Sequence, residues 1–323
     1  MRLLVLGGSE FVGRAVVEEG SRTGWKVTTF NRGTHPAPEG VTALRGDRLA
    51  DLSALERGEW DLVVDTWSHA PSAVRASARL LAGRAGHYSY VSTRSVYAFP
   101  TPADAAEDAP LVEGDPGGGE SGYDVMKRGS ELAVEESFGD RAAFVRAGLI
   151  LGPHENIGRL PWWLTRIARG GPVLAPGPAD GGIQFVDARD LAAWTLANPS
   201  FSGPCDLVSP VGHASMRDLL EACVAATGSD ADLRWTDPET ILAAGVEPWT
   251  ELPCWIPPGP GHDGMHGSDV SLALSTGLRC RPVTETVADT WTWLRSIGGR
   301  APQRPDRPPV GLTAETERRV LAL

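Results

Sequence analysis

An apolar strand that runs directly into a glycine-rich turn and then a helix opens the chain, and this feature constrains its fold most. Residues 2–6 form the apolar run, Gly7 and Gly8 follow, and a helical pattern begins near Phe11. Glycine permits a tight turn out of a strand, and the free N–H groups at the start of the next helix attract an anion such as pyrophosphate. We therefore predict a dinucleotide-binding turn made of Gly7, Gly8, Phe11, Val12 and Gly13.

Strand and helix patterns alternate through the first half of the chain. Apolar strands are expected at 2–6, 26–30, 41–45, 61–65, 87–92 and 142–147, and helices at 11–23, 71–85 and 123–138. Such alternation with short connections is typical of a parallel, doubly wound sheet. We predict an α/β fold: a Rossmann-like doubly wound parallel sheet with a smaller, mainly helical C-terminal substrate lobe.

The pattern changes after about residue 150, where prolines and glycines become frequent. Helices are expected at 159–169, 187–198, 215–227, 237–244, 269–275 and 284–297, and loops at 172–182 and 257–267. We predict a dinucleotide-binding Rossmann domain at 1–150 plus about 183–208. The substrate-binding lobe would comprise 151–182 and 209–298, followed by a linker and terminal helix at 299–323.

The end of the second strand bears on which dinucleotide fits the turn. A domain that binds NAD usually places a carboxylate about 20 residues after the glycines, where it binds the ribose 2′-hydroxyl. This chain has no Asp or Glu from residue 20 to 38, and Asn31 and Arg32 stand there instead. Because Arg32 can pair with a 2′-phosphate, we predict NADP as the cofactor, with NAD as the alternative. After the third strand, Asp47 can bond the adenine or simply close a turn.

Tyr123 and Lys127 lie four residues apart in a helix-favouring stretch, so they share one helix face. A phenol with an ordinary pKa of about 10 is a poor base at neutral pH, but a neighbouring ammonium stabilises the phenolate. The chain has four tyrosines, and Lys26 and Lys127 are its only lysines, so chance seldom produces this spacing. We predict Tyr123 as an acid–base group and Lys127 as its partner, able also to hold the nicotinamide ribose.

A cluster of hydroxyl side chains follows the strand expected at 87–92. Ser92, Thr93 and Ser95 lie there, at the end of a strand of the same sheet. A hydroxyl at this place can donate to a substrate carbonyl or alkoxide and stabilise the charge that develops there. The alternative is that these hydroxyls only satisfy backbone groups at the strand end.

Together these motifs resemble the short-chain dehydrogenase/reductase superfamily, in its extended or atypical NAD-dependent epimerase/dehydratase branch. The resemblance extends from residue 2 to about 298 and rests on the order and spacing of segments 7–13, 31–33, 46–47, 91–97, 123–127, 145–153 and 184–190. It implies that Tyr123 is the acid–base residue and that Lys127 holds the ribose and modulates the tyrosine. It further implies that Thr93 is the catalytic hydroxyl, with Ser92 and Ser95 as rivals, and that Thr66 lines the cofactor.

Three positions depart from the family pattern. Glu10 replaces the middle glycine of the turn, Asn31-Arg32 replaces the acid of NAD-dependent sugar epimerases, and Ala147 replaces a common proline. An anion beside a pyrophosphate is unfavourable, so the Glu10 side chain is expected to point to solvent or to Arg14. Dehydratases of this branch carry acids where this chain has Arg94 and Ser95, which makes dehydration less favoured.

Substrate contacts are expected after Gly152-Pro153 and near the return to the sheet. The candidates are His154, Asn156, Arg159 and Gln184. Trp162 and Trp163 are adjacent on a helix, so at least one of them is expected in the core. Trp249, Trp255, Trp291 and Trp293 are expected to serve packing. His262 and His266 lie in a Gly/Pro-rich loop, and we predict no metal site there.

Composition narrows the remaining possibilities. A formal net charge of −11 argues against a nucleic-acid-binding surface, and four widely spaced cysteines indicate reduced thiols. No targeting peptide and no membrane span are expected, which favours the cytoplasm, and we expect a monomer or homodimer.

The predicted function is that of an NAD(P)-dependent oxidoreductase or epimerase acting at a hydroxyl or ketone carbon of a small polar molecule, sugar-like or nucleoside-like. The alternative is a cofactor-sensing regulator or RNA-binding protein on the same fold. A hydrolase is a third hypothesis: Gly7-Gly8-Ser9-Glu10-Phe11 nearly matches a nucleophile elbow but lacks its final glycine.

Overall fold

The computed structural model describes residues 1–259, 261–300, 302–304 and 308–323. Its centre is a parallel sheet of seven strands in the order β11-β6-β5-β4-β1-β2-β3. The strands are β1 (Arg2–Leu6), β2 (Lys26–Asn31), β3 (Thr42–Arg45), β4 (Trp60–Asp65), β5 (Ala85–Thr93), β6 (Ala142–Ala147) and β11 (Gly203–Leu207). The order reverses between β1 and β4, where open α/β sheets bind their ligands. The predicted Rossmann-like doubly wound sheet is confirmed.

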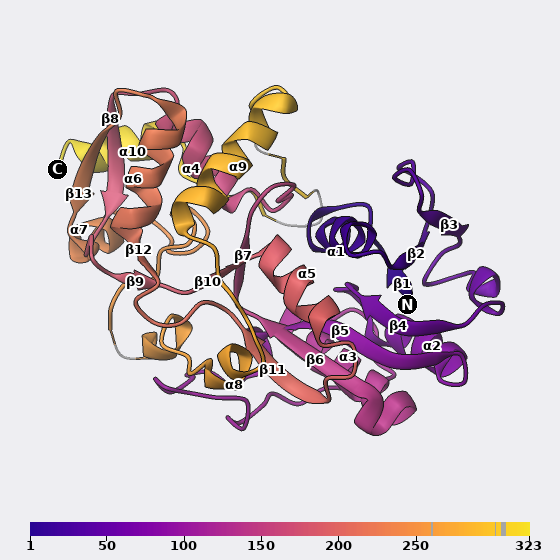
Figure 1. Ribbon diagram of the computed structural model, residues 1–323. Helices are drawn as coiled ribbons and strands as arrows, with labels where there is room; N and C mark the ends of the chain where they lie inside the picture. The colour runs from indigo at the N-terminus through magenta and orange to yellow at the C-terminus, as the bar shows by residue number, and fades with distance from the viewer. Residues whose placement is uncertain (260, 301, 305–307) are drawn as a thin grey trace.

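Helices cover both faces of this sheet (Figure 1). The helices α1 (Phe11–Arg22) and α5 (Ala188–Ala197) pack together on one face, and α2 (Pro71–Leu81) and α3 (Tyr123–Phe138) on the other. A hydrophobic core lies on each face of the sheet. Because successive strand residues point to opposite faces, β1 contributes side chains to both cores. Leu3 and Val5 belong to the core under α1 and α5, whereas Leu4 and Leu6 belong to the core under α2 and α3.

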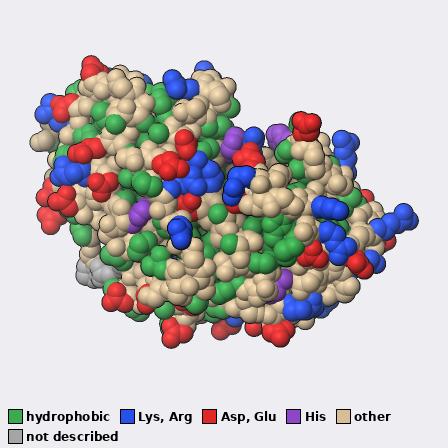
Figure 2. Space-filling model, viewed as in Figure 1, with side chains coloured by type: hydrophobic (Ala, Val, Ile, Leu, Met, Phe, Trp, Pro, Cys, Tyr) green, Lys and Arg blue, Asp and Glu red, His purple; other side chains and the backbone are tan. Residues whose placement is uncertain are grey.

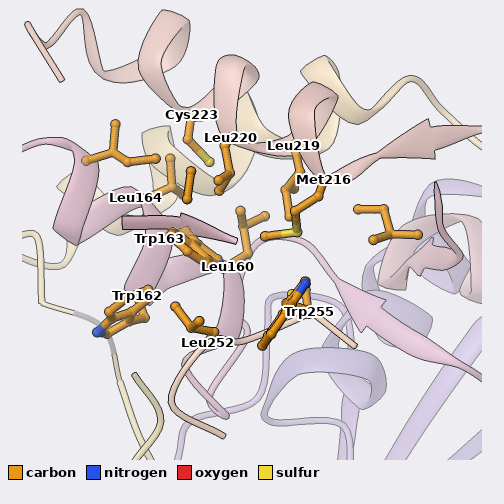
Figure 3. Close-up of a cluster of buried hydrophobic side chains, with 14 of the residues drawn as sticks. Leu160, Trp162, Trp163, Leu164, Met216, Leu219, Leu220, Cys223, Leu252 and Trp255 are labelled. Atoms are coloured by element: carbon orange, nitrogen blue, oxygen red, sulfur yellow. The ribbon is translucent and has the colours of Figure 1, made fainter. Parts of the chain in front are cut away.

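A third core holds the smaller lobe together (Figure 3). It lies among α4 (Arg159–Ile167), α6 (Met216–Thr227), α9 (Val283–Ser296) and the terminal helix α10 (Ala314–Leu321), with α7 (Pro238–Ala243) at its edge. Trp162 and Trp163 are both buried in this core, and the Trp163 indole donates to the carbonyl of Pro253 at 2.8 Å. Neither tryptophan is therefore a stacking surface for a ligand.

The short helix α8 (Ser271–Ser275) packs differently from its neighbours in the sequence. It contacts β11, and its Ala273 is buried in the core under α1 and α5. Residues 209–298 therefore do not all pack within the smaller lobe, although the predicted domain boundaries themselves stay a prediction.

The segment 172–182 is not the loop that its prolines and glycines predicted. Pro172–Pro176 forms β8, which pairs in parallel with β13 (Asp232–Thr236). The prolines stand at the two ends of β8, and the central Val-Leu-Ala run is buried. Three residues carry too little periodicity to identify a strand whose partner lies about 60 residues away.

Two further short pairings were not predicted. The strand β7 (Leu149–Leu151) pairs with β10 (Phe185–Asp187) in parallel, and β9 (Gly182–Ile183) pairs antiparallel with β12 (Ala214–Ser215). Within the described residues, no helix combines the length and the apolar character needed to cross a bilayer. The cytoplasmic location and the monomeric or dimeric state stay predictions.

Candidate active site

One cavity of about 670 Å³ opens at the carboxyl ends of the central strands. It is bounded by the glycine-rich turn, the ends of β4 and β5, the start of α3 and loops of the smaller lobe. Among the predicted site residues it brings together Phe11, Val12, Gly13, Thr66, Thr93, Tyr123, Lys127, Asn156 and Arg159. Gly7, Gly8, Asn31, Arg32, Asp47, His154 and Gln184 do not line it.

The glycine-rich turn leaves no room for side chains at its three glycines. Gly7 and Gly8 have φ of +116° and +91°, a region that L side chains rarely adopt. A Cβ on Gly13 would lie 2.7 Å from the Gly8 nitrogen, and one on Gly7 would lie 2.7 Å from the Thr66 hydroxyl. The Glu10 side chain makes no capping hydrogen bond to α1. The turn therefore fits a pyrophosphate at the start of α1.

Glu10, at the place of the missing glycine, is held by the smaller lobe. Its Oε2 accepts a 2.6 Å hydrogen bond from Nδ2 of Asn156, and its Oε1 lies 3.6 Å from Nε2 of His35. The Glu10 side chain was expected to point to solvent or to Arg14. Arg14 instead pairs with Glu18 at 2.7 Å, one helical turn along α1. The Glu10 side chain is exposed, so of the two expected directions it points to solvent and not to Arg14, because the i,i+4 partner Glu18 on the same helix pairs with the arginine.

At the end of β2, Asn31 organises the turn. Its Nδ2 donates to the Gly7 carbonyl at 3.3 Å and to the Ser9 hydroxyl at 3.2 Å, and its Oδ1 accepts the Gly33 N–H at 2.8 Å. The neighbouring Arg32 is exposed. Asn31 thus shapes the rim of the glycine-rich turn, and Arg32 presents an exposed cation beside it.

Asp47, at the end of β3, closes a turn. Its Oδ1 accepts the Leu49 N–H at 2.8 Å, and its backbone bridges to Asp51. Of the two roles that the sequence allows for Asp47, this geometry displays the closing of a turn.

Lys127 is only 3% exposed and lies against the strand ends. Its Nζ donates to the carbonyl oxygens of Trp67 at 2.8 Å and Val91 at 2.7 Å, and lies 4.6 Å from the centre of the Tyr90 ring. The lysine thereby ties α3 to the loop after β4 and to β5. Tyr123, at the first position of α3, is partly exposed and lines the same cavity.

The hydroxyl cluster at the end of β5 separates into two environments. The Ser92 hydroxyl donates to Glu131 at 2.7 Å, within a buried ion pair between Glu131 and Arg146. The Thr93 hydroxyl accepts the Ser95 N–H and donates to the Ser95 hydroxyl, each at 3.2 Å. Because Ser92 is engaged by a carboxylate, Thr93 and Ser95 are better placed to serve a substrate oxygen.

Arg94 anchors the loop that closes the cavity from the smaller lobe. Its Nε lies 3.1 Å from Oδ2 of Asp206, and its Nη2 donates to the Gly264 carbonyl at 3.2 Å. Tyr97 donates to the other Asp206 oxygen at 2.7 Å. Burial raises the pKa of Asp206 to about 6, although Arg94 opposes this shift. The position where a dehydratase would carry an acid thus holds a structural cation.

Two of the predicted substrate residues lie outside the cavity. The Gln184 side chain is buried and bonds backbone groups: its Nε2 donates to the carbonyls of Ser209 and Ser268, and its Oε1 accepts the Ser268 N–H. The His154 ring packs against Trp293 with ring centres 5.2 Å apart. Burial lowers the pKa of His154, which disfavours its charged form.

Sequence reasoning did not assign several further residues to the site, although they line the cavity. They include Phe99, Trp249, Met265, His266 and Arg304. Trp249 lies beneath the Arg159 guanidinium, 5.0 Å from ring centre to Cζ. The His266 Nδ1 accepts the Gln184 N–H at 3.1 Å, and burial lowers its pKa to about 4. In the described part of the chain, no three His, Cys, Asp or Glu side chains gather as a metal site would require.

Comparisons with known proteins identify the family of the chain. The model of the NAD dependent epimerase/dehydratase family matches residues 3–198. The chain belongs to this family. A similar protein is the 2′-dehydrokanamycin reductase of Streptomyces kanamyceticus, which is 29% identical over 248 residues, 71% of this chain and 67% of that protein.

Solved structures share the fold across nearly the whole chain. A UDP-N-acetylglucosamine 4-epimerase of Methanobrevibacter ruminantium has a TM-score of 0.68 at 17% identity, covering 92% of this chain and 98% of that one. The NAD⁺ complex of the Bordetella bronchiseptica enzyme WbmH has a TM-score of 0.66 at 18% identity, covering 92% and 99%. At these identities the likeness shows the fold alone.

This chain is therefore an NAD-dependent enzyme. It is an oxidoreductase or epimerase that acts at a hydroxyl or ketone carbon. The similar proteins are reductases and epimerases, so the comparisons do not support the alternative of a regulator or RNA-binding protein. On the face drawn in Figure 2, the described acidic and basic side chains are interspersed and form no continuous basic surface.

Proposed function

We propose that this chain is an NADP(H)-dependent reductase that acts on a ketone of a small polar, sugar-like substrate. The observation that carries the proposal is the convergence of Tyr123, Lys127 and Thr93 on the cavity that the glycine-rich turn also lines. The reductive direction is supported by the similar 2′-dehydrokanamycin reductase, whose name describes the reduction of a dehydro compound.

In this proposal, Tyr123 gives a proton to the substrate oxygen as the ketone becomes an alcohol. The nicotinamide cofactor supplies the hydride from its C4 position when bound. Thr93 donates a hydrogen bond to the same oxygen and stabilises its developing negative charge. Lys127, whose two backbone acceptors hold it beside α3, places a positive charge near Tyr123 and favours its phenolate after proton transfer.

The preference for NADP over NAD rests on the ends of β2 and β3. Arg32 is exposed there, and a Cβ on Gly33 would lie 3.0 Å from Nε of Arg45. Two arginines thus stand beside the turn that Asn31 organises, where an NAD enzyme would present a carboxylate. Guanidinium groups of this kind pair with a 2′-phosphate through charge-assisted hydrogen bonds.

Epimerisation is the second candidate, favoured by the matched family and by the fold of sugar epimerases. It would begin with Tyr123 accepting a hydroxyl proton and would return the hydride to the other face. Dehydration is less favoured because Arg94, bound to Asp206, occupies the position of the acid.

Turnover with NADPH deuterated at C4 tests the proposal. A reductase consumes one NADPH for each product molecule and places deuterium on the new carbinol carbon, whereas an epimerase shows no net consumption. Tyr123→Phe should lower turnover by a factor on the order of 100 to 10,000 while NADPH binding is unchanged. Undiminished turnover in this variant would contradict the role of Tyr123.

A further inference from the structure

One wall of the cavity runs from the hydroxyl cluster at the end of β5 into the smaller lobe. Arg94, next to Thr93, donates to the carbonyls of residues 264 and 265 at 3.2 Å and 3.5 Å. His266 comes next, and its ring centre lies 6.4 Å from that of Trp249. All of these residues line the cavity. Trp249 therefore stands on a wall that begins beside the hydroxyl proposed to serve the substrate oxygen.

Trp249 has a backbone conformation that a bulky residue rarely adopts. Its φ is +64°, in the left-handed region, where a large side chain is strained. The surrounding loop holds this conformation: the Trp249 N–H donates to the Trp255 carbonyl at 3.1 Å, and the Thr250 carbonyl accepts the Gly311 N–H at 2.8 Å. Trp255 is itself anchored, because its indole donates to the Gly177 carbonyl at 2.9 Å. Strained residues persist where the surrounding structure fixes them, and they cluster at functional sites.

The Trp249 ring supports the guanidinium of Arg159, the first residue of α4. The guanidinium carbon lies 5.0 Å from the ring centre, which is a cation–π contact. Stacking of this kind fixes the plane of a guanidinium without using its N–H donors. Between described residues, the guanidinium of Arg159 makes no hydrogen bond and no ion pair. Its donors are therefore held at the cavity wall and can pair with a ligand.

The buried acid Glu155 does not take up these donors. Its Oε1 accepts the backbone N–H of Arg159 at 2.7 Å, and its Oε2 accepts that of Leu160 at 3.2 Å. The charge of Arg159 acts on Glu155 through space, where it opposes the rise in the pKa of Glu155 that burial causes. Arg94, the other arginine of this wall, is paired with Asp206 at 3.1 Å. Arg159 is thus the arginine of this wall whose planar fork can bind an anion.

We propose that Trp249 is a positioning residue that holds Arg159 for an oxyanion of the substrate, a carboxylate or a phosphate group. The fork of a guanidinium matches two oxygens of either group. A substrate whose ketone lies at Thr93 would extend along this wall and place its acidic group on Arg159. The inference rests on the proposed function and names its substrate class, an acidic, sugar-like ketone.

Binding of three probes to the NADPH complex of the full-length protein tests the role of Arg159. D-glucuronate carries a carboxylate, D-glucose 6-phosphate carries a phosphate and D-glucose carries neither, and titration by saturation-transfer NMR measures each Kd. The natural protein should bind both anions more tightly than glucose. Arg159→Ala should raise the Kd of the anions about tenfold or more and leave glucose binding within about twofold. The matched control Arg169→Ala removes an exposed arginine that follows α4 and does not line the cavity, and it should change no Kd.

Two substitutions of Trp249 test its positioning role. Trp249→Leu loses the cation–π contact and should raise the Kd of both anions about three- to tenfold, whereas Trp249→Phe keeps an aromatic ring and should stay within about twofold of the natural protein. Neither should change glucose binding. Trp293→Leu is the matched control, because it removes another partly buried tryptophan of the smaller lobe that does not line the cavity. Equal loss of all three probes in the Phe and Leu variants would reduce Trp249 to a packing residue.

Other outcomes would overturn the inference at Arg159. They are an anion Kd that Arg159→Ala leaves unchanged, or an equal loss of glucose binding, which indicates distortion of the cavity. A rise in the Kd of both NADH and NADPH in Arg159→Ala, measured without a probe, would assign the arginine to the pyrophosphate instead. A natural protein that binds glucose as tightly as the anions would exclude an acidic substrate. None of these measurements requires hydride transfer, so a failure of the reductase proposal is seen separately, in NADPH turnover.

Discussion

Asn156 of the smaller lobe donates a 2.6 Å hydrogen bond to Glu10 of the glycine-rich turn. The two residues are 146 positions apart in the chain, and they join the lobe to the start of α1. Glu10 occupies the position where the family carries a glycine beside the pyrophosphate. The hydrogen bond gives the carboxylate a donor within the protein, which favours an orientation compatible with an anion at the start of α1.

Removing this hydrogen bond should weaken cofactor binding. In Asn156→Ala the Glu10 carboxylate loses its donor and becomes free to turn toward the pyrophosphate, so we expect the Kd of NADPH to rise about three- to tenfold. Glu10→Gly in the same background should restore it, and fluorescence titration measures both. If the double variant binds as weakly as Asn156→Ala alone, the repulsion is not the cause.

A methyl group at Gly13 should abolish dinucleotide binding. Its Cβ would lie 2.7 Å from the Gly8 nitrogen, so the turn must open and the N–H groups at the start of α1 must move. Gly13→Ala should therefore leave no measurable NADPH binding and lower the melting temperature. Gly83→Ala is the matched control, since a Cβ there has nothing within 4 Å and the residue is not at positive φ. Retained affinity in Gly13→Ala would contradict the placement of the pyrophosphate.

Arg32 should determine the preference for NADP. Arg32→Ala is expected to raise the KM for NADPH about 10- to 100-fold and to leave that for NADH unchanged, because only the 2′-phosphate loses its ion pair. Steady-state rates with each cofactor measure the effect. Arg57→Ala, which removes another exposed arginine, should change neither value. A parallel rise for NADH and NADPH would contradict the assignment of the 2′-phosphate to Arg32.

Glu155 should make stability depend on pH. Its carboxylate is buried and accepts the N–H groups of Arg159 at 2.7 Å and Leu160 at 3.2 Å, and burial raises its pKa from an ordinary 4.5 to about 7. The folded state therefore holds a proton that the unfolded chain releases above pH 4.5. The stabilisation is complete below pH 4.5 and is lost as the pH rises through 7.

Urea unfolding at pH 5 and pH 7.5 measures this effect. Between these values the free energy of unfolding should fall by about 2–3 kcal/mol more in the natural protein than in Glu155→Gln, whose amide oxygen can still accept the N–H groups. Equal pH dependence in the two proteins would show that Glu155 does not titrate in this range.

Much of the fold could be predicted because its signals are local. The alternation of strands and helices, the glycine turn and the Tyr123–Lys127 spacing each occupy a few consecutive residues whose periodicity reports burial. The pairing of β8 with β13 carries no such signal, since three buried residues identify a strand only once a distant partner supplies its hydrogen bonds.

The sequence by itself determined a doubly wound dinucleotide fold and an oxidoreductase family, and it predicted Tyr123, Lys127 and Thr93 as the catalytic group. These predictions depend on the short-range spacing of residues within each motif. Such spacing decides directly which residues share a helix face or lie at the end of a strand. Only the tertiary structure decided that Gln184 serves the backbone, that Asn156 holds Glu10 and that Arg304 lines the cavity. Each of these joins segments more than 20 residues apart, and packing of the whole chain sets which distant polar groups meet.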